Sequence, residues 1–264
     1  MGTQVYPSPD RREVEQVLTI DETSVRVLLL DIEGTTTPVG FVYEVLFPFA
    51  SRHLASYLGG HFSEPETNAL IEALKAQHAA DKAQGLNPPE LSGGSGEATL
   101  GLLAAYGQWL IARDSKCPAL KALQGKIWQA GYESGELHGQ VYPDVPLAFE
   151  RWRRQNREIA VYSSGSVLAQ QLLFRSTTAG DLTFFLKDFF DTKIGIKTEA
   201  ESYRRILVSL KCKERNVLFI SDAVKELDAA RSVGMWTALC MRAEPDKPLA
   251  RNHPFIRTFD EVFL

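Results

Sequence analysis

The chain has 264 residues, of which 44% are hydrophobic and 23% are charged, and its formal net charge is −4 at pH 7. This length allows one large domain, or a core domain with a smaller one. The acidic balance argues against a nucleic-acid-binding protein, which would carry a clustered basic excess. The richest basic segment, residues 151–157 (RWRRQNR), is typical of the solvated face of a helix.

Cysteine usage and the absence of long apolar runs indicate the compartment. Cys117, Cys212 and Cys240 are far apart and form no CxxC pair, which predicts free thiols in a reducing compartment. No hydrophobic run is long enough to span a bilayer, and the first residues lack an apolar signal core. We therefore expect a cytosolic protein without a membrane partner.

Short apolar runs along the chain predict buried β-strands. Their apolar residues are continuous rather than alternating, which is typical of a parallel sheet covered by helices on both faces. These runs are residues 25–30 (VRVLLL), 158–163 (EIAVYS), 216–220 (NVLFI) and 236–240 (WTALC).

Helical patterns separate these runs. In residues 202–210 four apolar side chains share one face, and Thr198 and Glu201 have capping-box spacing at the start. Residues 223–234 form a second helical pattern that closes at Gly234. Strand and helix in alternation predict an α/β doubly wound domain.

Residues 41–141 interrupt this alternation with helical patterns only. Pro118 suits the first turn of one helix, and residues 85–98, rich in Pro, Gly and Ser, suit an exposed loop. Two apolar faces are expected, the first from Leu100, Leu103, Gly107, Leu110 and Ile111, the second from Leu120, Leu123, Ile127 and Ala130. The predicted organisation is an N-terminal extension (1–22), an α/β core (23–40 and 142–264) and an inserted helical cap (41–141).

Polar residues follow the predicted strands where a ligand site is expected. Asp31 and Glu33 follow the first strand, Ser163 and Ser164 end the second, and Asp222 follows the third. In an open parallel sheet, ligands bind at the carboxyl ends of the strands, so these residues should meet. Lys197, just before a helix, is the candidate cation. Each feature alone fits a turn, a helix cap or a surface lysine, but their combination favours one site.

The chemistry of these groups is complementary. Carboxylates of Asp31 and Asp222 are hard oxygen ligands suited to Mg²⁺. An aspartate beside Mg²⁺ and a lysine can attack phosphorus, and Glu33 can protonate the leaving alcohol and then activate water. Gly34 allows a sharp turn, and Ser163 can donate a hydrogen bond to a phosphoryl group.

These motifs carry a family resemblance. LLLDIEGTTTP, VYSSGS, the lysine of KIGIK and FISD resemble, in order, the four signature motifs of the haloacid dehalogenase (HAD) superfamily of phosphotransferases. The glutamate of DIEGTTTP, where that superfamily commonly has aspartate, together with FVYEVLFPFA and FDTKIGIKTEAESYRRI, resembles its enolase-phosphatase (acireductone synthase) family of methionine salvage.

The resemblance implies a HAD-like Rossmannoid fold and a bifunctional enzyme with one Mg²⁺ per subunit. Such enzymes convert 2,3-diketo-5-methylthiopentyl-1-phosphate to its enol phosphate, and then to acireductone and inorganic phosphate. Asp31, Glu33 and Asp222 would bind the metal, with Asp31 and Glu33 catalytic, and Ser163, Ser164 and Lys197 would bind substrate. Whether Glu33 uses its side chain or its backbone carbonyl on the metal stays open. The resemblance also implies a cytosolic monomer, with the nucleus as a second location.

Alternative functions remain at this point. The chain could be a Mg²⁺-dependent HAD phosphatase for another small phosphomonoester, without the enolase step. A receiver-type signalling domain also has a phospho-accepting aspartate with a Ser/Thr and a Lys, but Glu33 and the large insertion disfavour storage of the phosphoryl group. A binding protein on a dead enzyme scaffold is disfavoured by the complete motif set.

Some residues outside these motifs have an open role. The base of the enolisation step is not identified by the motifs, and Glu33 is the candidate. Tyr43, Phe47 and Trp128 could line a pocket for the methylthio tail, but we expect them rather in the core of the cap. The five histidines show no metal-binding spacing and are interpreted as structural or exposed.

Overall fold

The structure is a computed structural model that describes residues 20–91, 97–243 and 252–264. Most of the predicted N-terminal extension therefore lies outside the described residues, as do residues 92–96 of the predicted loop. Among the described helices, none combines the length and apolar character that crossing a bilayer requires. The three cysteines are free thiols.

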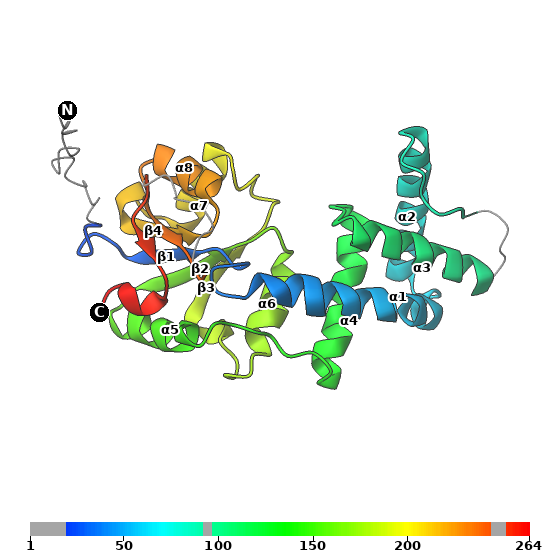
Figure 1. The fold of residues 1–264 in the computed structure, drawn as a ribbon, viewed down its shortest axis with the longest axis horizontal. Helices are drawn as coiled ribbons and strands as arrows, with labels where there is room; N and C mark the ends of the chain where they lie inside the picture. The colour runs from blue at the N-terminus through cyan, green and yellow to red at the C-terminus, as the bar shows by residue number, and fades with distance from the viewer. Residues whose placement is uncertain (1–19, 92–96, 244–251) are drawn as a thin grey trace, which may run out of the picture.

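A six-stranded parallel sheet forms the centre of the α/β part and confirms the predicted fold class (Figure 1). Its strand order is β3-β2-β1-β4-β5-β6. The strands are β1 (Val27–Leu30), β2 (Glu158–Tyr162), β3 (Leu186–Phe190), β4 (Val217–Ser221), β5 (Trp236–Cys240) and β6 (Phe255–Ile256). All four strands predicted from the apolar runs are present.

Two strands, β3 and β6, are absent from the sequence prediction. They lie at the two edges of the sheet, where a strand needs fewer apolar residues because one side is not paired. β3 includes the polar pair Lys187 and Asp188, and β6 has only two residues, so neither shows a continuous apolar run.

Helices cover both faces of the sheet, which explains why the central strands are apolar throughout. Leu28 and Leu30 of β1 join a hydrophobic cluster with α5 and α6, while Val27 and Leu29 join a second cluster with α7 and α8. These helices are α5 (Asp144–Arg154), α6 (Val167–Arg175), α7 (Ala200–Leu210) and α8 (Val224–Ser232). Burial on both faces is the arrangement expected for a parallel sheet.

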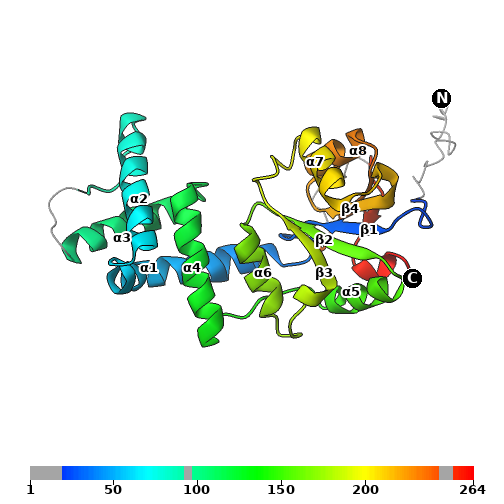
Figure 2. The same cartoon turned by 180° about the vertical axis from the view of Figure 1, so that it is seen from behind.

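The segment between β1 and α5 is helical and extends to one side of the sheet, as Figures 1 and 2 both show. It contains a π-helix, η1 (Phe41–Leu46), that continues into α1 (Phe47–His61), followed by α2 (Pro65–Ala83), α3 (Glu97–Ala112) and α4 (Pro118–Ser134). Pro118 is at the first position of α4, as predicted, and α4 ends at Gly135 with a left-handed φ of 78°.

Short 3₁₀ helices complete the fold: η2 (Thr183–Phe185), η3 (Glu214–Asn216) and η4 (Phe259–Glu261). The predicted capping box of Thr198 and Glu201 is wrong, because α7 begins at Ala200 and its N-cap residue, Glu199, makes no side-chain cap hydrogen bond. A capping box does form at η4, between Thr258 and Glu261.

The basic segment 151–157 is not simply a solvated helix face. The Arg151 guanidinium donates to the backbone carbonyls of Phe259, Val262 and Phe263 near the C-terminus, at 2.5, 3.2 and 3.1 Å. Trp152 is fully buried, and Arg157 stacks on the Phe263 ring. The solvated-face interpretation therefore holds for residues 153–156, which are exposed, but not for Arg151, which pairs the carbonyl groups of the C-terminal segment with hydrogen-bond donors.

The apolar faces predicted for the helical segment are largely buried. Leu103, Leu110 and Ile111 of α3 and Leu120, Leu123 and Ile127 of α4 belong to the hydrophobic cluster. Ala130 is the exception, since it is exposed on the surface of α4.

Candidate active site

Three neighbouring strands deliver the predicted residues to one end of the sheet. β1 lies between β2 and β4, so Asp31, Ser163 and Asp222 all follow adjacent strand ends. The Asp31 N–H donates to the Ile220 carbonyl at 2.9 Å, and the Ser163 N–H donates to the Phe190 carbonyl at 3.1 Å. Because sheet pairing continues into these residues, their backbones are held by the rigid sheet.

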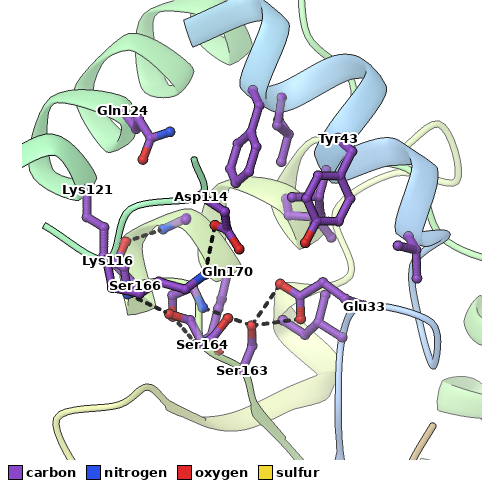
Figure 3. A pocket seen from close by; sticks show the side chains of 18 of the residues that line it. Glu33, Tyr43, Asp114, Lys116, Lys121, Gln124, Ser163, Ser164, Ser166 and Gln170 are labelled. Atoms are coloured by element: carbon purple, nitrogen blue, oxygen red, sulfur yellow. Dashed lines mark hydrogen bonds and ion pairs between the residues drawn. The ribbon is translucent and has the colours of Figure 1, made fainter. Parts of the chain in front are cut away.

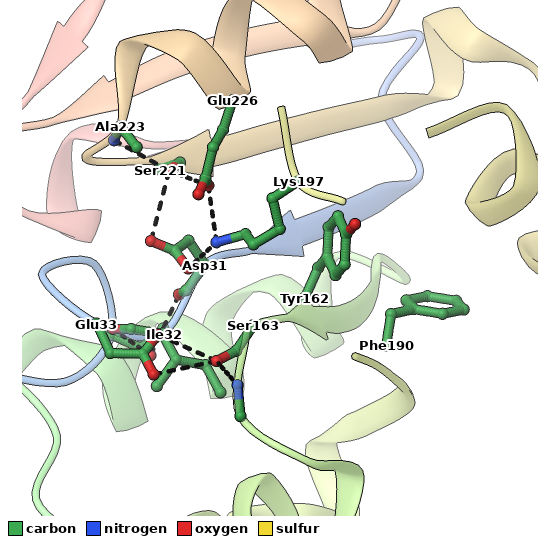
Figure 4. Close-up of polar contacts among 12 residues, drawn as sticks. Asp31, Ile32, Glu33, Tyr162, Ser163, Phe190, Lys197, Ser221, Ala223 and Glu226 are labelled. Carbon is green, nitrogen blue, oxygen red and sulfur yellow. Dashed lines mark hydrogen bonds and ion pairs between the residues drawn. The ribbon is translucent and has the colours of Figure 1, made fainter. Parts of the chain in front are cut away.

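Lys197 lies at the centre of the site, although it is 166 residues from Asp31 (Figure 4). Its ammonium contacts Asp31 Oδ1 at 2.5 Å and Glu226 Oε2 at 2.7 Å. The Lys197 carbonyl accepts a hydrogen bond of 2.7 Å from the Tyr203 hydroxyl, which fixes the backbone just before α7. The lysine is therefore a buried structural partner of the predicted nucleophile and not a surface lysine.

Glu226 is a site residue that the sequence prediction missed. It lies in the first turn of α8, four residues after Asp222, and its side chain is 15% exposed. The Ser221 hydroxyl donates to Glu226 Oε2 at 3.0 Å and lies 3.4 Å from Asp31 Oδ2. The available signal was its position one turn into the helix that follows FISD, which directs it back to the strand ends.

Glu33 and Ser163 form a second polar pair beside this centre. The Ser163 hydroxyl lies 3.1 and 3.0 Å from the two carboxylate oxygens of Glu33. The same hydroxyl accepts the Gly165 N–H at 3.0 Å, so its proton is directed to Glu33. Ser163 therefore holds the Glu33 carboxylate in place on the floor of the pocket described below.

Gly34 allows Asp222 to approach the loop after β1. The residue has φ of +78°, a left-handed conformation that side chains rarely adopt. A Cβ atom at this position would lie 2.2 Å from Asp222 Oδ2. The glycine is thus required both by the turn and by the closeness of the carboxylate.

The electrostatics of the site are dominated by clustered acids. Partial removal from water, with the charges of Asp31 and Glu226, raises the pKa of Asp222 to about 7. Burial, and then Asp31, raises the pKa of Glu33. Burial alone would lower the pKa of Lys197, but the charges of Asp31 and Glu226 outweigh it and raise that pKa. One ammonium thus faces several carboxylates, and the excess negative charge suits a divalent cation.

The predicted set of three metal-binding side chains is not assembled as such. Among the described residues, no group of three or more His, Cys, Asp or Glu side chains is arranged to hold a metal ion. The Glu33 carboxylate is engaged with Ser163, whereas Asp31 is close enough to Asp222 for its charge to raise the pKa of Asp222. These two carboxylates, which are hard oxygen donors in an acidic cluster, fit Mg²⁺ with further oxygen ligands from backbone, water or substrate.

A pocket of about 320 Å³ opens above these residues (Figure 3). Its floor includes Asp31, Glu33, Ser163, Ser164, Lys197, Asp222 and Glu226, so every predicted site residue lines it. Its upper wall comes from η1, α1, α4 and the segment between α3 and α4. Such a volume suits a small organic ligand.

The upper wall is partly apolar, and its residues correct the expected position of three aromatic side chains. Tyr43, Phe47 and Trp128 all line the pocket, and Tyr43 is 55% exposed. Their expected place in the core of the helical segment is therefore wrong for Tyr43 and incomplete for the other two. The indole N–H of Trp128 donates to the Leu46 carbonyl at 2.9 Å, which fixes the ring at the pocket wall.

Comparisons with known proteins give matches over most of this chain. The family model for haloacid dehalogenase-like hydrolases matches residues 25–234. A protein named Enolase-phosphatase E1 from Synechococcus elongatus is 44% identical over 239 residues, which are 90% of this chain and 98% of the relative. Proteins of the same name from Sorangium cellulosum and Drosophila mojavensis are 46% and 41% identical, over 90% and 89% of this chain and 97% and 92% of theirs.

Solved structures show the same architecture. The crystal structure of the UTR4 protein from Saccharomyces cerevisiae has a TM-score of 0.70 and 33% identity, and the match covers 90% of this chain and 100% of that one. CbbY from Rhodobacter sphaeroides, solved in complex with phosphate, has a TM-score of 0.53 at 17% identity, a likeness of fold alone.

Proposed function

This chain belongs to the haloacid dehalogenase-like hydrolases and, within them, to the enolase-phosphatase family, and on that premise we propose how its residues perform the reaction. The enzyme converts 2,3-diketo-5-methylthiopentyl-1-phosphate to its enol phosphate and then to acireductone and inorganic phosphate. The catalytic roles proposed below are supported chiefly by one observation, the contact of the Lys197 ammonium with the Asp31 carboxylate at the end of β1.

Asp31 is the proposed nucleophile. Its carboxylate is held by the rigid end of β1 and by the ammonium of Lys197. One carboxylate oxygen forms a bond to phosphorus while the bond from phosphorus to the ester oxygen breaks, which yields an aspartyl phosphate. Water then attacks the phosphorus of this intermediate and regenerates the carboxylate.

Glu33 is the proposed acid and base of this sequence. Its raised pKa favours a carboxyl group that can give a proton to the leaving enol oxygen and take one from the attacking water. Ser163 orients Glu33, and together with Ser164 and Lys197, which line the same pocket, it would bind the phosphoryl oxygens. Glu33 is also our proposed base for removal of the proton from C1 in the enolisation step.

Magnesium is the proposed metal, one ion per subunit, and the family is generally dependent on it. Asp31 and Asp222 would hold it with their carboxylates and Glu33 with its backbone carbonyl, because the Glu33 side chain is engaged with Ser163. When bound, the ion supplies positive charge that stabilises the phosphoryl group during transfer.

The helical segment 41–141 is the proposed cap. Its residues supply the upper wall of the pocket, where they exclude water and contact the part of the substrate beyond the phosphate. The proposed functional unit is a monomer, as the family resemblance implies.

The test supplies the diketone phosphate with Mg²⁺ and follows two signals together, the ultraviolet absorbance of the enol products and the release of inorganic phosphate. The expected result is a rise in absorbance accompanied by stoichiometric phosphate. Activity on simple phosphomonoesters with none on the diketone would instead favour a phosphatase for another small substrate.

A further inference from the structure

Helix α4 presents two polar side chains to the pocket, directly opposite the phosphate-binding end of the sheet. Lys121 and Gln124 are one helical turn apart and lie on the same face (Figure 3). The Lys121 ammonium donates to the Ser164 carbonyl at 3.1 Å. Gln124 is 5% exposed, yet its amide makes no hydrogen bond to any described residue.

An amide that has no protein partner and faces a cavity is available to bind a ligand. Its amide atoms are not among the fully buried unpaired polar atoms of the described residues, so they reach the pocket space, where a ligand can replace water as their partner. Lys116, the other lysine of this wall, is bound to Asp114 at 2.8 Å and has a side chain that is 60% exposed. Lys121 is therefore the better placed cation.

The order of groups along α4 runs from polar to apolar. Lys121 contacts Ser164 in the loop after β2. Gln124 follows one turn later along α4, and Trp128 lies one turn beyond Gln124. At 1.5 Å per residue, the three positions span about 10 Å along the helix axis. A substrate with a phosphate, then two adjacent carbonyl groups, then an apolar tail has the same order of polarity.

We propose that Lys121 is a catalytic residue of the enolisation step, as the proton donor to the C2 carbonyl oxygen, and that the Gln124 amide binds the C3 carbonyl oxygen. This inference rests on the proposed function. The C1–H bond breaks and its proton goes to the base, its electron pair forms the C1–C2 double bond, and the C2 carbonyl oxygen takes a proton from Lys121. Lys121 regains a proton from solvent after the step.

The surroundings of Lys121 support this role. Burial and the neighbouring Lys116 lower its pKa, although three carboxylates, of Asp191, Asp114 and Glu33, oppose that shift. An ammonium with a lowered pKa is a better proton donor to a developing enolate. The charged groups that face it come from the end of β3, the segment before α4 and the loop after β1.

A structural alternative is that Lys121 only links α4 to the loop after β2 through its contact with Ser164. Such a link would serve every substrate equally, because it would hold the pocket closed whatever is bound. A role on the carbonyl oxygen would affect only substrates that contain the diketone. The two possibilities are therefore separable by comparing two substrates.

The experiment measures kcat and KM of the full-length enzyme with Mg²⁺ on the diketone phosphate and on p-nitrophenyl phosphate, which has no carbonyl group. The variants are Lys121→Met, Lys121→Arg and Gln124→Leu. The control is Lys126→Met, since Lys126 is on the same helix but is paired with Glu66 at 2.8 Å on the surface. Thermal unfolding checks that each variant is folded.

We expect Lys121→Met to lower kcat for enol formation by about 10²-fold, as for the loss of one oxyanion donor, and to lower p-nitrophenyl phosphate hydrolysis far less. Lys121→Arg should recover KM but not kcat, because arginine keeps the charge and is a much weaker acid. Gln124→Leu should raise KM for the diketone by about 10-fold. Lys126→Met should behave as the wild type.

Equal losses on both substrates in Lys121→Met would show a structural link and overturn the proposal, as would no loss on either. If the wild type itself forms no enol from the diketone, the proposed function fails before any variant is compared. If the wild type is active and Lys121→Met matches it, only the role of Lys121 is rejected.

Discussion

At the scale of single residues, the site depends on how one ammonium is shared between two carboxylates. Lys197 contacts both Asp31 and Glu226, and the Ser221 hydroxyl connects the same two acids from the other side. The ammonium neutralises part of the charge on Asp31 through its contact with Oδ1, whereas Oδ2 lies 3.4 Å from the Ser221 hydroxyl. Substitution of Asp31 or Glu226 by its amide should therefore change the rate of the reaction and leave the fold intact.

Asp31→Asn should reduce phosphate release by about 10³-fold or more, because an amide cannot form the aspartyl phosphate. The fold should persist, since the asparagine can still accept a hydrogen bond from Lys197. Phosphate release and circular dichroism on the same sample check both expectations. Turnover near the wild-type rate in this variant would mean that another residue is the nucleophile.

Glu226→Gln should lower kcat/KM by about 10-fold. The amide keeps the hydrogen bonds to Lys197 and Ser221 but loses its charge, so the ammonium pairs more strongly with Asp31 and reduces the reactivity of that carboxylate. Steady-state kinetics are the measurement. Lys225→Gln, an exposed neighbour on α8, is the control, and a similar loss there would point to a general effect of the helix.

At the scale of elements, the loop after β1 is fixed by hydrogen bonds within itself and to Arg242. The Thr36 hydroxyl lies 3.3 Å from the carbonyls of both Asp31 and Ile32. Arg242 donates to the Thr35 carbonyl from two of its nitrogens, at 3.0 and 2.7 Å. The loop that carries the proposed nucleophile is therefore held by Arg242, more than two hundred positions away in the sequence.

Gly34→Ala should lower activity by about 10²-fold, because the new methyl group would displace Asp222 and strain the left-handed backbone. Gly135→Ala is the matched control: it has the same φ of +78°, but a Cβ there meets nothing within 4 Å. That variant should lose only about 1 kcal/mol of unfolding free energy and keep its activity. Kinetics and urea unfolding distinguish the two cases, and equal activities would contradict the displacement of Asp222.

Arg242→Met should destabilise the fold by about 3–5 kcal/mol, because it leaves the buried carboxylate of Asp144 without its ion pair. That carboxylate also accepts the Phe259 N–H, so the C-terminal segment is coupled to the same arginine. Arg154→Met is the control, since its pair with Glu150 is exposed and contributes about 0.5 kcal/mol or less. Comparable losses of unfolding free energy in the two variants would reject this account.

At the scale of the whole molecule, the active site forms because three neighbouring strand ends face one helical segment. The ends of β2, β1 and β4 provide the floor of the pocket, and α4 with η1 provides the opposite wall. Neither part encloses a ligand alone. Since both walls serve one substrate, both half-reactions should share the same requirement for metal.

Removal of Mg²⁺ with EDTA should therefore abolish both enol formation and phosphate release. Mg²⁺ added back should restore both and raise the midpoint of thermal unfolding, because bound cation offsets the repulsion among the site's carboxylates. The two signals are followed in parallel during chelation. Enol formation that survives EDTA would restrict the metal to the phosphoryl step.

Much of this structure follows from local sequence pattern. The continuous apolar runs before Asp31, Ser163 and Asp222 predict buried parallel strands, and strand ends are where ligands bind in such sheets. The class of fold and the place of these residues at one end of the sheet could thus be anticipated. The edge strands β3 and β6 could not, because an edge strand needs no continuous apolar run.

What only the tertiary structure decides is which distant groups touch. Lys197 has no local feature that distinguishes it from a surface lysine until α7 places its ammonium between Asp31 and Glu226. The local sequence around Glu226 and Gln124 is that of ordinary helix residues. Both side chains reach the pocket because of the way in which α8 and α4 are oriented in the fold. The pattern of apolar residues in a sequence predicts whether a side chain is buried. The partner of a buried polar group is determined by packing between segments that are distant in the sequence.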